Sequence, residues 1–189
     1  MGISSIGSSQ SLYRNQNLYQ NYRQLSSGKR INSAADDAAG LAIAQKMLTQ
    51  SNGYDVGWRN AATSQDMLNV AEGGLSKITD SLQRIRELSI QASNTAVYGD
   101  DDRESMQQEI DQLKDYISDA AKNTQFNTMN LLDGTMGSSH VASSPDGSGM
   151  DIKMPNAVLE SLGISDYDVT GNFDISTIDD AIEKVSSAR

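Results

Sequence analysis

The chain has 189 residues, no cysteine, 5% aromatic residues and a net charge of −10. This acidic balance argues against nucleic acid as a partner and against an acidic membrane surface, because phosphate binding needs concentrated positive charge. Without cysteine the chain has no disulfide and no thiolate metal site, and it contains no run of about 18 apolar residues that would span a bilayer.

The core is expected to be thin and helical. Hydrophobic residues make up 37% of the chain and the mean hydropathy is −0.50. Such a composition suits long helices that share a narrow apolar seam better than it suits stacked sheets.

Residues 1–33 are predicted to form an arm and a linker. The first 25 residues are rich in Ser, Gln and Asn, and their apolar positions are loosely spaced. This weak amphipathic helix buries too little surface to offset its ordering entropy, so we expect disorder in the monomer and helix formation against a partner. A frayed terminus is the alternative. Asn32 or Ser33 is the candidate cap of the next helix, with Asp36 and Asp37 in its first turn.

Residues 34–133 are predicted to form a helical-bundle domain with helices at about 34–93 and 101–124. Asp101 and Glu104 are expected to cap the second helix. Apolar residues alternate in steps of three and four, as in a coiled coil, and two such seams joined by a short loop predict an antiparallel hairpin. The seam positions singled out are Leu68, Leu75, Ile78, Leu82, Ile85, Met106, Ile110, Leu113 and Ile117.

Residues 134–173 change character, with many glycines and both prolines, and are predicted to form a small β-rich hairpin segment near Met150–Met154. A third helix is expected over 174–189, started by Ser176 with Asp179 or by Thr177 with Asp180. Because this helix stops after a few turns, we expect a fragment or a helix completed by another molecule. Its seam comprises Ile175, Ile178, Ile182 and Val185. The fold class is therefore mainly α, a long coiled-coil-like antiparallel helical bundle with a small β-hairpin region.

No catalytic, metal or cofactor site is predicted. His140 is the single histidine, so a histidine pair for zinc and a serine–histidine triad are both implausible. The run 100–102 is acidic but lacks EF-hand spacing, and the glycines at 147 and 149 lack the lysine of a phosphate loop. These observations favour an interaction protein over an enzyme.

Several long motifs resemble bacterial flagellins, in the order and spacing of that family. They are LSSGKRINSAADDAAGLAIAQKM (25–47), RNAA (59–62), AEGGL (71–75), LQRIRELSIQASN (82–94), NTQFNTMNLLDG (123–134) and the final IDDAIEKVSSAR. The chain departs from the family in its tyrosine-rich arm and in Trp58.

The resemblance implies a structural subunit of the flagellar filament, which self-assembles outside the cell for swimming motility. It further implies export through the flagellar type III apparatus, with an export chaperone and a cap protein as partners. Residues 134–173 would replace a large outer domain, and this chain alone would not polymerise normally. A hook–filament junction protein is the alternative.

The resemblance also implies recognition of the helical domain by Toll-like receptor 5. The matching positions are Gln83, Arg84, Arg86, Glu87, Leu88 and Glu109. Arg84 and Leu88 are four residues apart and share a helix face. Leu88 falls off the heptad seam, so we predict that it points outward as an interface anchor. The alternative is that Arg84 and Glu87 merely form a solvated ion pair.

Overall fold

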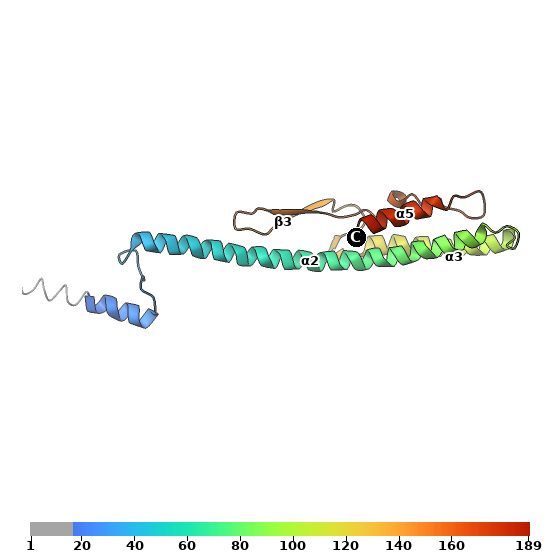
Figure 1. The fold of residues 1–189 in the computed structure, drawn as a ribbon. Helices are drawn as coiled ribbons and strands as arrows, with labels where there is room; N and C mark the ends of the chain where they lie inside the picture. Colours follow the sequence, from blue (N-terminus) through green and yellow to red (C-terminus); the bar gives the residue numbers. More distant parts are fainter. Residues whose placement is uncertain (1–16) are drawn as a thin grey trace, which may run out of the picture. The chain divides into compact units, whose positions relative to one another are not determined.

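The computed structural model describes residues 17–189, and the chain divides into one unit up to Asp55 and a second unit from Val56 onward. The predicted fold class is confirmed, because long helices dominate and the strands form two small antiparallel hairpins (Figure 1). The elements are α2 (Ala38–Ala92), α3 (Asp100–Asn123), β1 (Gln125–Phe126), β2 (Met129–Asn130), β3 (Ser138–Ala142), β4 (Gly149–Lys153), α4 (Leu159–Leu162) and α5 (Ser176–Ser187).

The first unit contains a helix over residues 17–27, an irregular segment and the start of α2. Asp36 organises the irregular segment, since its carboxylate accepts the backbone N–H groups of Asn32 (3.1 Å) and Ser33 (3.0 Å). The cap of α2 was predicted wrongly. Asp37 Oδ1 accepts the N–H of Gly40 at 2.8 Å, so the helix begins at Ala38 and not near residue 34.

Predictions for residues 1–16 lie outside the described residues. The expected disorder of the arm in the monomer therefore stays a prediction. The helix over residues 17–27 is followed by Gly28, whose φ of +65° is the left-handed conformation that commonly terminates a helix.

In the second unit α3 runs back alongside the C-terminal half of α2, as the two seams predicted (Figure 1). The start of α3 differs from the prediction by one residue. It begins at Asp100, and the carboxylate of Asp102 accepts the N–H of Gly99 at 3.0 Å. The capping pair is therefore Gly99 with Asp102, and not Asp101 with Glu104.

Two hairpins follow α3. The β1–β2 turn places Asn127 at φ +48° and Thr128 at φ +65°, the combination that a type I′ turn requires. The β3–β4 hairpin pairs Val141 with Met150, so β4 lies close to the predicted Met150–Met154 run. Its tip rests on α2 at Gly57, where an added Cβ would lie 2.1 Å from the carbonyl oxygen of Ser143.

The rest of the segment predicted as β-rich is not a sheet. From residue 159 the chain forms the short helix α4, ended by Gly163 at φ +84°, and then a loop that returns to the bundle. Four side chains of α4 and the loop are buried, namely Leu162, Ile164, Tyr167 and Val169. This stretch is part of the bundle core, which local composition did not indicate.

Helix α5 starts at Ser176, close to the predicted boundary. Its capping residue again differs from the expected ones and lies two residues before Ser176. Asp174 Oδ1 accepts the N–H of Ser176 at 2.9 Å, so Asp174 takes the role that was assigned to Ser176 or Thr177.

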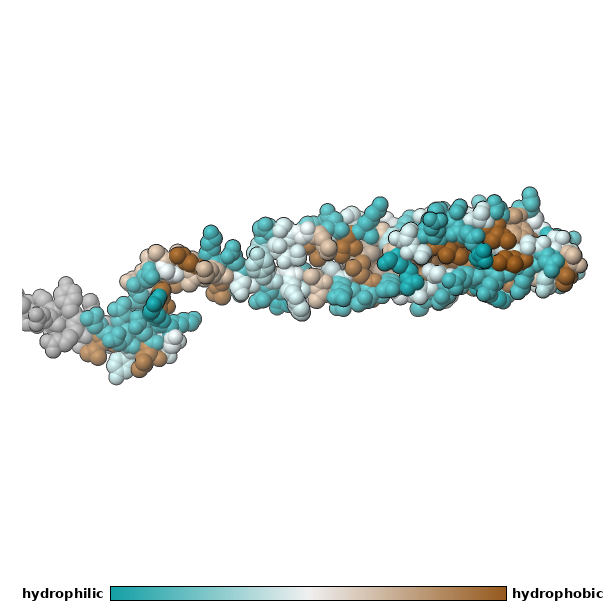
Figure 2. Space-filling view, viewed as in Figure 1, coloured by the Kyte–Doolittle hydropathy of each residue, from teal (hydrophilic) through white to brown (hydrophobic). Residues whose placement is uncertain are grey.

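The hydrophobic core lies where α2, α3, α5 and the returning loop meet. Figure 2 shows a largely hydrophilic surface on which hydrophobic residues appear in a few separate patches. The side chains that are fully excluded from solvent include Ile78, Leu82, Ile85, Ile110, Ile117, Leu131, Leu132, Ile164 and Ile178.

Candidate functional site

Most predicted seam positions lie in the core of the second unit. Leu75 is 3% exposed and Val185 2%, while six isoleucine and leucine side chains of the seams are completely buried. Met106, Leu113 and Ile182 pack against this core while remaining partly exposed, and Ile175 is also partly buried.

Leu68 does not belong to the buried seam. Its side chain is 41% exposed, whereas its neighbour Met67 is 5% exposed and Ala71 4%. Glu72, one turn further along α2, pairs with Arg189 just beyond the end of α5. Leu68 therefore lies past the part of α2 that α5 covers, and periodicity alone did not reveal where that cover ends.

Leu88 corrects a second prediction. It was expected to point outward, but it is 2% exposed and belongs to the hydrophobic core. Arg84 is one turn earlier on the same side of α2 and reaches Glu109 of α3. Leu88 consequently faces α3. The buried stripe of α2 is wider than a heptad seam here, because α2 packs against two neighbours and not one.

Arg84 is the centre of an ion-paired cluster on the surface. Its Nε lies 2.8 Å from Glu109 Oε1 on α3, and its Nη1 lies 3.1 Å from Glu87 Oε2 on α2. The hydrogen bonds with Glu109 and then Glu87 raise the pKa of Arg84 further above its usual value. The side chains of Arg84 and Glu109 are each 44% exposed, and that of Glu87 is 65% exposed, so all three are accessible from solvent. Exposed pairs of this kind add little stability.

Arg86 lies on a different side of α2. Residues two apart on a helix are separated by roughly 200°, and Arg86 Nε pairs with Asp179 Oδ1 of α5 at 2.6 Å. The two arginines of the predicted receptor set therefore join α2 to two different helices. Gln83 and Glu87 are exposed on the outward side.

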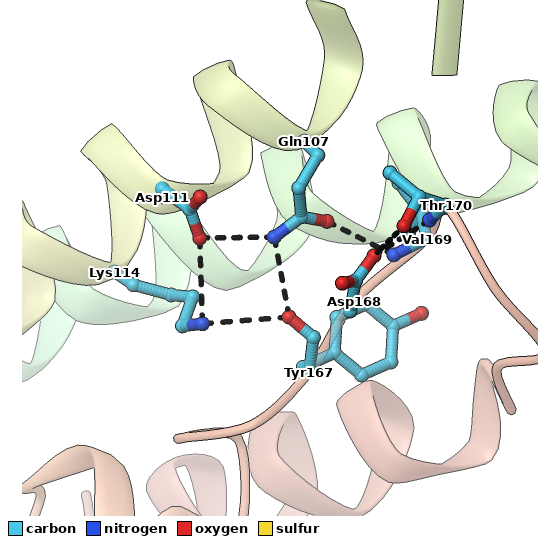
Figure 3. Close-up of polar contacts among 7 residues, drawn as sticks. All are labelled: Gln107, Asp111, Lys114, Tyr167, Asp168, Val169 and Thr170. Carbon is cyan, nitrogen blue, oxygen red and sulfur yellow. Dashed lines mark hydrogen bonds and ion pairs between the residues drawn. The ribbon is translucent and has the colours of Figure 1, made fainter. Parts of the chain in front are cut away.

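The loop before α5 is held by side chains of α3, as Figure 3 shows. The amide of Gln107 accepts the N–H of Val169 at 2.9 Å, and both Gln107 and Lys114 donate to the carbonyl oxygen of Tyr167 at 3.4 Å. Asp111 accepts from the same two donors. Sequence analysis missed this contact, because it joins side chains to backbone groups more than 50 residues away.

Tyr167 is anchored in the interior as well. Its hydroxyl donates to Ser89 Oγ at 2.9 Å, and Ser89 is fully buried on α2. Burial raises the pKa of the Tyr167 phenol. The ring of Phe173 packs edge-on against Tyr167 with centroids 6.2 Å apart, so the loop contributes aromatic packing to the core.

The first unit presents its apolar side chains to solvent. None of residues 17–55 is buried. The exposed large side chains are Leu18, Tyr19, Tyr22, Leu25, Ile43, Met47, Leu48 and Tyr54, with exposed fractions from 53% to 86%. In the second unit the single tryptophan, Trp58, is also 76% exposed.

Within residues 17–189, no group of three or more His, Asp or Glu side chains is arranged to hold a metal ion. No helix in this described part is long and apolar enough to cross a membrane. His140 pairs with Asp151 across the β3–β4 hairpin, at 2.7 Å.

A helical bundle with ion-paired surface residues and an exposed apolar arm defines a structural interaction protein. The chain belongs to the bacterial flagellin family, whose members build filaments and are not enzymes: residues 3–136 match the family described as bacterial flagellin N-terminal helical region.

Curated relatives agree with this assignment. The chain is 36% identical to "Flagellar filament core protein flaB2" of Brachyspira hyodysenteriae, over 99% of this chain and 73% of the relative. It is 37% identical to "Flagellin FlaB1" of Treponema pallidum (strain Nichols), over 88% of this chain and 65% of the relative. It is 38% identical to "Polar flagellin E" of Vibrio parahaemolyticus, over 78% of this chain and 40% of the relative. The chain thus spans between two fifths and three quarters of these relatives.

Proposed function

We propose that this protein assembles with further copies of itself into the filament of a bacterial flagellum, outside the cell, and serves swimming motility. The observation that carries the proposal is the first unit, in which eight large apolar side chains are exposed and none of residues 17–55 is buried. An apolar surface of this kind is typical of a protein-interaction site. The partner of a filament subunit is another subunit, and the similarity to proteins named flagellar filament core protein and flagellin supports this choice.

A motility-deficient bacterium that lacks its own flagellin provides the test. We expect the full-length product of the gene that encodes these 189 residues to restore filaments that are visible by electron microscopy. Leu25→Gln, which removes the apolar side chain at the most exposed of the eight positions (86%), is expected to shorten or abolish them. Val97→Gln is the matched control, since Val97 is 68% exposed but lies in the loop before α3. Absence of filaments from the parent protein at normal expression would count against assembly.

We further infer that the protein leaves the cell through the flagellar type III apparatus, with an export chaperone and a cap protein as partners. Family membership supports this route. The measurement is the amount of secreted protein in a strain whose export apparatus is inactivated. Unchanged secretion in that strain would refute the route without bearing on filament assembly.

A second proposed function is recognition of the helical unit by Toll-like receptor 5. The supporting observation is that Gln83, Arg84 and Glu87 are exposed together and that Glu109 joins them through Arg84. We propose that these four residues form the receptor face. Arg86 would contribute through the position of α5, and Leu88 through the packing of α2 on α3.

A receptor-reporter assay separates contact from packing. Arg84→Ala is expected to reduce signalling strongly while the melting temperature stays near that of the parent. Leu88→Met, which keeps the core volume, is expected to signal normally. Arg86→Ala is expected to have a smaller effect than Arg84→Ala. Full signalling by Arg84→Ala would eliminate this receptor face.

A further inference from the structure

Both ring nitrogens of His140 face oxygen acceptors. Nδ1 lies 2.7 Å from Asp151 Oδ1 on β4, and Nε2 lies 3.1 Å from the carbonyl oxygen of Gly147 in the hairpin loop. A neutral imidazole carries only one N–H, whereas the cation carries two. Only the protonated ring therefore donates to both oxygens. In the neutral ring one nitrogen lone pair would face an oxygen lone pair.

The two contacts connect three parts of the hairpin. His140 is on β3 and Asp151 is its cross-strand partner, so the first contact spans the ladder. The second reaches the loop over residues 143–148. The other hydrogen bonds of this loop are local. The N–H groups of Ser143 and Ser144 donate to Ser148 O and that of Gly147 donates to Ser144 O, each at 3.0 Å, and Asp146 accepts from Ser148.

The braced loop is the part of the hairpin that contacts α2. Asn60 Nδ2 donates to the carbonyl oxygen of Ala142 at 3.0 Å. The carbonyl of Ser143 fits against Gly57, where no side chain larger than hydrogen would be accommodated. A change at the loop is therefore transmitted to the place where the hairpin rests on the helix.

Among the charges around the ring, Asp151 favours the protonated form and Lys153 opposes it. Asp151 is the direct partner, Lys153 is the next residue of β4 on the same face, and Asp146 in the loop is occupied by the N–H and hydroxyl of Ser148. Val141 is buried and Ile152 packs against the core, so the opposite face of the hairpin is turned toward α2. The charged side chain of α2 nearest in sequence to the contact is that of Arg59, which is exposed to solvent.

We propose that His140 is a proton-operated latch, which holds the 143–148 loop and its seat on α2 when protonated and releases them when neutral. The hydrogen bond with Asp151, followed by that with Gly147, raises the pKa of His140 above its ordinary value of 6.5. For a raised pKa the latch is fully closed below 6.5, and it opens as the pH rises through the higher value of the folded protein. His140 is the single histidine of the chain, so it is the expected source of a transition in this pH range.

Nuclear magnetic resonance on the complete chain tests the latch. Ring resonances of His140 are followed between pH 5 and 9, together with hydrogen-exchange protection of the amides of Ser143, Ser144 and Gly147, corrected for intrinsic exchange. We expect the ring to titrate above 6.5, and the three amides to lose protection several-fold with the same midpoint. Titration at or below 6.5, or amide protection that does not follow the ring, would overturn the proposal.

Three variants sharpen the result. Asp151→Asn removes the charged acceptor while keeping the shape, and it is expected to lower the midpoint of the ring and of the amides together. Asp166→Asn removes the same charge from an exposed position before the Tyr167 anchor, and it is expected to change neither. His140→Gln is expected to abolish the pH-dependent loss of protection. Persistence of the transition in that variant would assign it to another group and refute the latch.

Discussion

Replacing Leu88 by alanine tests whether this residue belongs to the core or to an outer contact surface. Leu88 is 2% exposed, while Ile90, two residues along the same helix, is 46% exposed. The pair therefore offers two aliphatic truncations in one helix with opposite burial. If Leu88 is in the core, its truncation lowers the free energy of unfolding by much more than truncation of Ile90 does.

The magnitude follows from the atoms removed. Leucine to alanine deletes three carbons, which at about 0.8 kcal/mol per buried methylene gives roughly 2.4 kcal/mol of lost transfer free energy. A residual cavity of roughly 40 Å³ would add about 1 kcal/mol at about 24 cal/mol per Å³. We expect Leu88→Ala to lower the free energy of unfolding by about 3 kcal/mol, and Ile90→Ala to lower it by less than about 1 kcal/mol.

Urea unfolding followed by circular dichroism at 222 nm is the assay. With an m-value of about 2 kcal/mol/M, the midpoint of Leu88→Ala is expected to fall by roughly 1.5 M. Equal midpoints for Leu88→Ala and Ile90→Ala would refute the burial of Leu88 and restore its outward orientation. An unchanged m-value in both variants is the control that the unfolding transition is the same.

Three other predictions follow from the same contacts. Thr128→Gly is expected to stabilise the protein by about 1 kcal/mol, because a β-branched residue is strained in the left-handed region; a lower urea midpoint would contradict the strain. Tyr167→Phe leaves the buried Ser89 hydroxyl without its donor and is expected to cost about 1 kcal/mol in the same assay; no loss would show that the hydrogen bond is dispensable. The pKa values of Asp133 and Asp168 are lowered by hydrogen bonds from the side-chain hydroxyl and then the backbone of the threonine two residues on. Their stabilisation is complete above the ordinary value of 3.8 and is lost as the pH falls through the lower folded-state values, so the melting temperature is expected to fall as the pH is lowered below 3.8, and less steeply in Asp133→Asn.

Helical periodicity predicted the centre of the bundle well. Ile78, Leu82 and Ile85 on α2 and Ile110 and Ile117 on α3 are all completely buried, because a heptad pattern directly encodes which side of a helix meets its first neighbour. The heptad pattern does not indicate whether a second helix packs against the same helix, or at which residue a packed helix ends. For this reason the pattern wrongly predicted that Leu88 points outward, and it wrongly placed Leu68, which lies beyond the end of α5, in the buried seam.

Helix caps and long-range polar contacts were harder to predict. Several aspartates near each helix start were compatible with capping, and only the geometry selects Asp37, Asp102 and Asp174. The returning loop was read as β-rich because glycines and polar residues dominate its composition. Its position depends on Gln107 and Lys114, which bind backbone groups of the loop. Contacts to the backbone leave no recognisable pattern in the loop's side chains.

The exposure of Trp58 has a practical consequence for spectroscopy. The only tryptophan of the chain is already 76% exposed in the folded second unit, so its emission is expected to change little when the bundle unfolds. It would shift to the blue only when another surface covers this side of α2. Trp58 is thus a built-in fluorophore that reports association while remaining nearly silent to unfolding, and this lets one cuvette distinguish the two events.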